Sequence, residues 1–301
     1  MSILTPKFLS RHQESPMPNS PTISRARKLG FILLPITFLL VLRLFLPYIA
    51  ETAINREFRS ISGFRARIAD IDLALLRGGI TLEGIVVDKL GTPPDTPFLT
   101  IDRLSVLVDP LGLFEGGLVA RGSAVNPSLT IVLSSDSEKN QLPKDAQPLL
   151  DRFRELVAFR IDYFEATNGA IRFHNTRSSP SYRLEMTNID AQVRNLTNSS
   201  KLSDTLFATV NASAQAQQTG RFSLSASLNP VSHPPIFDMR TELLGLSATS
   251  LDSFTEAYAG FDFKEGTISV LAEIEARRGV VSGFVTPTFR NVSIFSPGSD
   301  E

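Results

Sequence analysis

The chain has 301 residues, of which 42% are hydrophobic and 20% are charged, and its formal net charge is −1. This composition is ordinary for a chain that buries a core, and it excludes a disordered protein. The absence of cysteine excludes disulfides, thiolate metal sites, cysteine nucleophiles and a lipidated N-terminal cysteine. Basic residues are not clustered after residue 50, which argues against nucleic-acid binding.

The first segment, residues 1–28, is predicted to be a disordered cytoplasmic tail. Its centre, HQESPMPNSPTIS, is rich in Pro, Ser and Asn and has no hydrophobic periodicity. The segment carries five basic residues against the single acidic residue Glu14, so the exported part of the chain must be acidic to give the total of −1.

The longest apolar run, LGFILLPITFLLVLRLFLPYI, predicts a transmembrane anchor over residues 29–50. As a helix it would be roughly 31 Å long, close to the thickness of a hydrocarbon core. Arg43 would cost about 2–3 kcal/mol at the membrane centre and less near an interface, so the span tolerates it. A cleaved signal peptide is the competing interpretation, but Ala50 and Thr52 match an A-x-A cleavage site poorly.

The charges that flank this run predict the orientation of the chain. Basic residues precede the span and Glu51 follows it, so the N-terminus is expected in the cytoplasm and the bulk of the chain outside. For a single-pass protein of a bacterial inner membrane, that compartment is the periplasm. A helical extension with Ile54, Phe58 and Ile61 on one side is predicted to end at Gly63.

Short segments with an apolar residue at every second position follow from Phe64 onward, each closed by turn residues. Strict alternation means one buried and one wet face, which predicts a mainly β protein with a long, twisted antiparallel sheet of ten or eleven strands curled into an apolar groove. The predicted strands are ARIADIDLALL, ITLEGIVVD, DRLSVLVD, SLTIVLS, GAIRFHN, YRLEM, NIDAQVRNL, LFATVNASAQA, RFSLSASLN and those in GTISVLAEIEARRGVVSGFVTP.

The three clearest of these strands supply a candidate apolar face for the groove. Their opposite faces carry Ser, Thr, Asn, Gln and Glu. Alanines on the apolar face leave room for acyl chains, although they also allow close packing by a helix, and a second protein layer is the alternative cover. The candidate residues are Val210, Ala212, Ala214, Phe222, Leu224, Ala226, Ile268, Val270, Ala272 and Ile274.

Two short helices interrupt the strands. Leu149, Phe153 and Val157 form an apolar stripe at helical spacing in KDAQPLLDRFRELVAF. In SLDSFTEAYAG, Ser250 is predicted to cap a helix that ends at Gly260. Both helices are expected to cover the open side or the end of the sheet.

The sequence offers no catalytic, cofactor or metal site. His12, His174 and His233 are scattered, and their surface or strand-edge interpretation is the favoured one. The carboxylate pairs in DID at residues 70–72 and EIE at residues 273–275 suit acid–base work or a divalent cation, but their favoured role is to keep the outer face of a sheet in water. No nucleotide-binding or nucleophile-elbow motif occurs.

Residues 51–297 resemble the AsmA-like bacterial envelope proteins, in particular the branch that is described as a conserved domain of unknown function. The likeness lies in INR at residues 54–56, in IADIDL followed by an RG turn and EGI, and in FRIDYFEATNGAIRFHN. The segment GFDFKEGTISVLAEIEARRGVVSGFVTP completes it, and residues 298–301 are a polar tail. Relatives continue past the equivalent of Phe295, so the chain is expected to be a short homologue or one piece of a longer groove.

The resemblance implies a groove related to those of bridge-like lipid-transfer proteins. We therefore expect a non-enzymatic, membrane-anchored protein that binds or conducts phospholipid acyl chains for outer-membrane lipid homeostasis. An envelope scaffold or assembly factor that binds protein partners is the alternative. A hydrolase or transferase is third, and it would need His174 to meet carboxylates in the fold.

The topology prediction is tested by alkaline phosphatase fused after Glu301. The fusion is expected to be active outside the cytoplasm, because the positive flank of the span stays inside. Enzyme activity in whole cells measures this. Activity confined to the cytoplasm would overturn both the topology and the compartment.

Overall fold

The computed structural model of the protein describes residues 64–74, 78–89, 96–109, 112, 117–135 and 158–295. All of them belong to one compact unit, Leu46–Glu301. The predicted tail, the anchor, its helical extension, the helix with Leu149 to Val157 and the polar tail lie outside these ranges. Within the described ranges, no helix is both long and apolar enough to cross a membrane.

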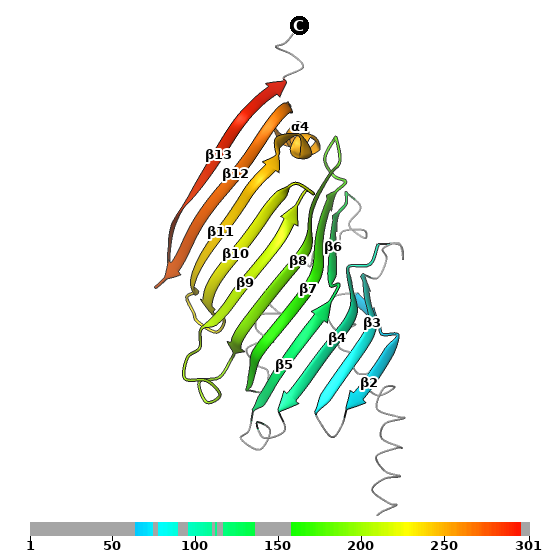
Figure 1. Ribbon diagram of the computed structural model, residues 1–301, viewed down its shortest axis with the longest axis vertical. Helices are drawn as coiled ribbons and strands as arrows, with labels where there is room; N and C mark the ends of the chain where they lie inside the picture. Colours follow the sequence, from blue (N-terminus) through cyan, green and yellow to red (C-terminus); the bar gives the residue numbers. More distant parts are fainter. Residues whose placement is uncertain are drawn as a thin grey trace, which may run out of the picture. The chain divides into compact units, whose positions relative to one another are not determined.

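The described chain forms a single large sheet, so the prediction of a mainly β protein is confirmed (Figure 1). Its order is β1-β3-β4-β5-β7-β8-β9-β10-β11-β12-β13, with β2 beside β3, and β6 beside β4 and β7. The strands are β1 Phe64–Arg67, β2 Asp70–Ala74, β3 Gly79–Lys89, β4 Leu99–Asp109, β5 Leu118–Val125, β6 Ser128–Leu133, β7 Phe159–Asn175, β8 Tyr182–Thr197, β9 Ala208–Ala216, β10 Gly220–Asn229, β11 Ile236–Ser247, β12 Asp262–Arg277 and β13 Val280–Phe295.

The sheet is mixed, which corrects the prediction of an antiparallel sheet. Strands β5 and β6 both run parallel to β7, whereas the other pairings are antiparallel. A parallel pair requires a crossover of a dozen or more residues, and residues 134–158 supply it. Because β5 and β6 pair with successive parts of the long β7, they act as two halves of one strand that is interrupted at Asn126 and Pro127.

Local kinks keep the apolar residues of neighbouring strands on the same side of the sheet. A first row of residues with positive φ crosses β3 to β8 and consists of Gly84, Asn126, Asn168 and Asn188. At each of them the apolar positions shift by one residue, as from Phe164 and Ala166 to Ile171 and Phe173 in β7. A second row consists of Gly245 in β11, Gly266 in β12 and Asn291 in β13. Because side chains alternate along a strand, a shift without such a kink would turn them to the other face.

Hydrogen bonds join two members of the first kink row to each other and to the strands on either side, β4 and β8. The Asn168 amide donates to Oδ1 of Asn126 at 2.7 Å, and the Asn126 amide donates to Asp102 in β4 at 2.6 Å. The backbone N–H of Asn168 donates to Asp190 in β8 at 3.0 Å. Asparagine suits these positions because it tolerates the left-handed conformation and pairs with the neighbouring strand.

One short helix, α4 (Asp252–Ala259), follows the 3₁₀ turn η2 (Ala248–Leu251) between β11 and β12. The helix predicted in this segment is thus present, and Gly260 ends it with φ 69°, as expected. Ser250 does not cap it, because Ser250 lies within η2 and donates its hydroxyl to the Ser247 carbonyl.

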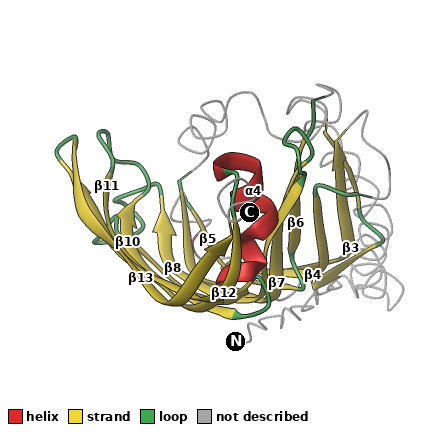
Figure 2. Cartoon of the chain, turned by 90° about the horizontal axis from the view of Figure 1, so that it is seen from above, coloured by secondary structure: helices red, strands yellow, loops and turns green. Residues whose placement is uncertain are grey.

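The sheet curls around α4, which lies on its concave side (Figure 2). The helix contacts both β8 and β12, which are four positions apart in the strand order. Four strand spacings cover about 19 Å in a flat sheet, more than the 10–12 Å width of a helix. Contact of this one short helix with both strands agrees with the curvature toward this face that Figure 2 shows.

Replacement of Asn168 by Ala is expected to lower the free energy of unfolding by about 1–2 kcal/mol, because alanine is strained at φ 53° and the side-chain hydrogen bond to Asn126 is lost. Urea unfolding followed by circular dichroism measures this. Asn211→Ala in the regular part of β9 is the control and should cost less than about 0.5 kcal/mol. Equal losses in the two variants would contradict a special role of the kink.

Candidate functional site

The apolar face of the sheet is continuous from the first strands to the last. Residues that pair directly across neighbouring strands share a face, so the register traces rows across the sheet. The first apolar row runs through Leu73, Ile80, Val106, Gly122, Phe164, Val193, Val210, Ala226, Met239, Ile274 and Gly283. Every member of this row is apolar, over eleven strands.

The adjacent row on the same face is nearly as apolar and contains small residues at its centre. It runs through Ile71, Leu82, Leu104, Ala124, Ala166, Ala191, Ala212, Leu224, Thr241, Ala272 and Val285. Four consecutive members, from β5 to β9, are alanines. We call these four, Ala124, Ala166, Ala191 and Ala212, the alanine strip. It extends over three strand spacings, about 14 Å.

All ten residues predicted for the apolar face lie on this one face. Val210, Ala226 and Ile274 belong to the first row, and Ala212, Leu224 and Ala272 belong to the second. Ala214, Phe222 and Val270 form a third row with Leu243, and Ile268 follows opposite Leu246.

Sequence reasoning missed three members of the alanine strip: Ala124, Ala166 and Ala191. The first two meet through the parallel pairing of β5 with β7, which joins segments that are 42 residues apart. A local sequence pattern does not predict a pairing between segments so far apart. A partial signal exists in the Asn and Gly residues at which the alternation slips by one position, since these mark the kinks.

Burial on the apolar face is concentrated at its two ends. One buried cluster consists of Phe64, Ala66, Ile85 and Val87 near the N-terminal edge. The other consists of Ala248, Phe263 and Ile268, beneath η2 and α4. Between them, the apolar side chains of β9 and β10 from Val210 to Ala214 and from Phe222 to Ala226 are only half-buried.

A small polar cluster attaches α4 to the sheet at one end of this face. The buried Asn175 amide donates to the hydroxyls of Tyr182 at 3.3 Å and Tyr258 at 3.2 Å, and the two hydroxyls lie 3.2 Å apart. The Tyr182 ring packs edge-on against Phe254 with centroids 5.2 Å apart. Burial, and then the hydrogen bond with Tyr258, raise the pKa of Tyr182. The cluster therefore closes the end of the apolar face with neutral groups.

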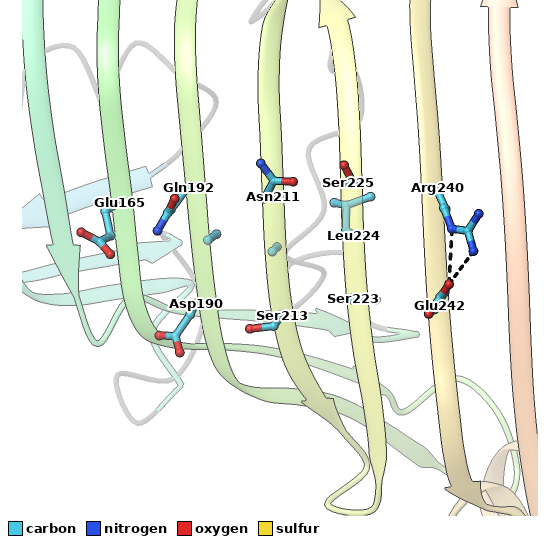
Figure 3. A pocket seen from close by; sticks show the side chains of 12 residues that line it. Glu165, Asp190, Gln192, Asn211, Ser213, Ser223, Leu224, Ser225, Arg240 and Glu242 are labelled. Carbon is cyan, nitrogen blue, oxygen red and sulfur yellow. Dashed lines mark hydrogen bonds and ion pairs between the residues drawn. The ribbon is translucent and has the colours of Figure 1, made fainter.

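The opposite face is polar and contains open hollows. The hollow in Figure 3 has a volume of about 520 Å³ and is bordered by the Arg240–Glu242 ion pair of 2.8 Å. A neighbouring hollow of about 720 Å³ reaches Arg277 and Asp238. The side chains that line the first hollow from four adjacent strands are uncharged or acidic: Glu165, Asp190, Gln192, Asn211, Ser213, Ser223 and Ser225.

The charged residues considered for chemistry are used in contacts on the polar face. Arg240 lies 2.5 Å from Glu273, and Arg277 lies 3.2 Å from Glu275. His174 pairs across the strands with Arg183, and burial, together with that guanidinium, lowers its pKa. No group of three or more potential metal ligands occurs in the part of the chain that the structure describes.

Comparison with known proteins gives no assignment. No protein-family model matches the sequence, and no significant match is found among curated proteins.

Replacement of the buried Asn175 by Ala is expected to lower the free energy of unfolding by about 1–3 kcal/mol, because two tyrosine hydroxyls and the Arg177 N–H lose their partner. Urea unfolding measures the loss. Tyr258→Phe is the matched control: Tyr258 is 63% exposed, so water can take the place of its hydroxyl beside Asn175 and Tyr182, and the change should cost less than about 1 kcal/mol. A larger effect of Tyr258→Phe would contradict this assignment of the cluster.

Proposed function

We propose that the apolar face of the sheet binds phospholipid acyl chains and that the protein contributes in this way to lipid homeostasis of the bacterial envelope. One observation carries the proposal. Two neighbouring rows of almost uniformly apolar side chains cross the sheet, yet on β9 and β10, between the two end clusters, these side chains are only half-buried. A large apolar surface of this kind typically marks an interaction site.

The chemistry of the face suits a flexible hydrocarbon better than a headgroup. The two rows contain one hydroxyl, that of Thr241, and no charge. Burial of each methylene contributes about 0.8 kcal/mol, so half an acyl chain supplies several kcal/mol without any directed polar contact. The alanine strip gives this chain a shallow place to lie, because its neighbours in the first row include Phe164, Val193 and Val210.

The resemblance of residues 51–297 to AsmA-like envelope proteins supports the same proposal. It adds a context, in which an anchor in the inner membrane holds the face in the periplasm and the carried molecule is a phospholipid. The curvature of the sheet toward its apolar side also agrees with a lipid-holding groove (Figure 2). The scaffold alternative requires that protein segments cover the same face.

Lipid binding is tested on residues 51–301, exported to the periplasm and purified without detergent. Mass spectrometry of organic extracts is expected to find phospholipid at near-stoichiometric amount. Ala212→Asp and Ala226→Asp should each reduce it about tenfold or more, because a carboxylate on the apolar face repels an acyl chain.

Ser213→Asp and Ser225→Asp are matched controls on the same strands, one residue away and on the polar face. They should leave the lipid content unchanged, and circular dichroism should show the same strand content in all four variants. A folded protein without lipid would move the scaffold function to first place. Loss of the fold in the apolar-face variants alone would mean that these residues are simple core.

A further inference from the structure

The last strand, β13, is an edge with an unusually apolar surface. It pairs with β12 on one side, and no described strand lies on its other side. Two valines and one phenylalanine of the apolar face lie at this edge. Val281 is 67% exposed, Val285 is 60% exposed and Phe289 is 57% exposed. A long apolar edge is a template for pairing with another strand unless it is protected.

The protection along β13 is partial. Arg290 is its single charged residue and Pro287 its single proline. Position 283 requires glycine, because it packs closely against β12: a Cβ there would lie 2.1 Å from the Glu273 carbonyl oxygen. On the side away from β12, no strand within the described ranges pairs with β13.

We propose that β13 pairs in antiparallel fashion with β13 of a second copy of this chain, about a two-fold axis that passes through Val285. Such an axis, perpendicular to the sheet, puts the apolar faces of both copies on the same side. It also requires that odd-numbered residues oppose odd-numbered residues, because a shift by one position would oppose apolar to polar side chains.

Among the registers that meet this condition, the one centred on Val285 is the most complementary. Val285 opposes its own symmetry mate and Val281 opposes Phe289, a favourable pair of β-branched and aromatic side chains. Pro287 opposes the small Gly283. A register centred on Pro287 would instead place two prolines opposite each other, and one centred on Phe289 would include the kink at Asn291.

The charges and the length of the paired segment agree with this register. Pairing extends over residues 280–290 and stops just before the kink at Asn291. Arg290 opposes Val280, so the two arginines lie at opposite ends of the segment, about 33 Å apart, and do not repel. The pairing would join the two apolar faces into one surface of twice the length. It does not depend on lipid binding.

Cysteine crosslinking in the full-length protein tests this register, and the chain offers a cysteine-free background. Val285→Cys should form a disulfide-linked dimer on oxidation in cells, seen on a non-reducing gel, because the two Cα atoms would be about 5.5 Å apart. Val281→Cys and Phe289→Cys alone should give at least tenfold less dimer. The double variant Val281→Cys/Phe289→Cys should again crosslink, since each cysteine opposes the other type.

Equal crosslinking of all single variants, or crosslinking of none while circular dichroism shows them folded, would overturn the proposal. Hydrogen exchange on the unmodified protein gives a second readout: the outer amides of β13 should gain protection as the concentration rises. Protection that is independent of concentration would mean that a segment of the same chain covers the edge, which also overturns it. The lipid content of the variants should not change, so failure here is distinguishable from failure of the lipid proposal.

Discussion

Thirteen strands can share one apolar face only if each strand stays in phase with its neighbours, because side chains alternate with a period of two. In this sheet the alternation of apolar and polar side chains is shifted by one residue at kinks where a Gly or Asn has positive φ. The kinks at Asn126, Asn168 and Asn188 lie beside one another around β7, and Gly84 lies two strands further along, with β4 between, so the shift is repeated across this part of the sheet. The apolar rows, their curvature and the polarity of the opposite face all depend on this matching.

The distribution of burial follows from the same plan. A single sheet has no second layer of its own, so it reaches full burial only where an additional element or a sharp local curl covers it. This occurs at η2 and α4 and at the cluster around Phe64 and Val87. The alanine strip lies between these ends, where the side chains are smallest. The strip is buried at Ala124 and half-buried at Ala166, Ala191 and Ala212, so its part from β7 to β9 combines small side chains with incomplete cover.

Much of the sheet was predictable from sequence, but its connections were not. Strict alternation identified β9, β10 and β12 and placed all ten candidate residues on one face. The separate predictions of YRLEM and NIDAQVRNL were wrong, because Asn188 kinks a single strand, β8, instead of ending it. The parallel pairing of β7 and the cluster of Asn175, Tyr182 and Tyr258 join residues that are far apart in sequence, so neither leaves a local pattern. The strand count was low partly because β11 alternates poorly around Leu244.

The contacts of the described part run almost entirely between sheet neighbours, and η2 and α4 are its main cross-links between more distant strands. Cooperativity in such a sheet is close to one-dimensional, as in repeat proteins, where each unit is stabilised mainly by the next. The strands nearest an open edge then unravel first, and those enclosed by α4 unravel last. The small helix thus sets a boundary for local unfolding: it ties β8 to β12 and makes the three strands between them, β9, β10 and β11, open together.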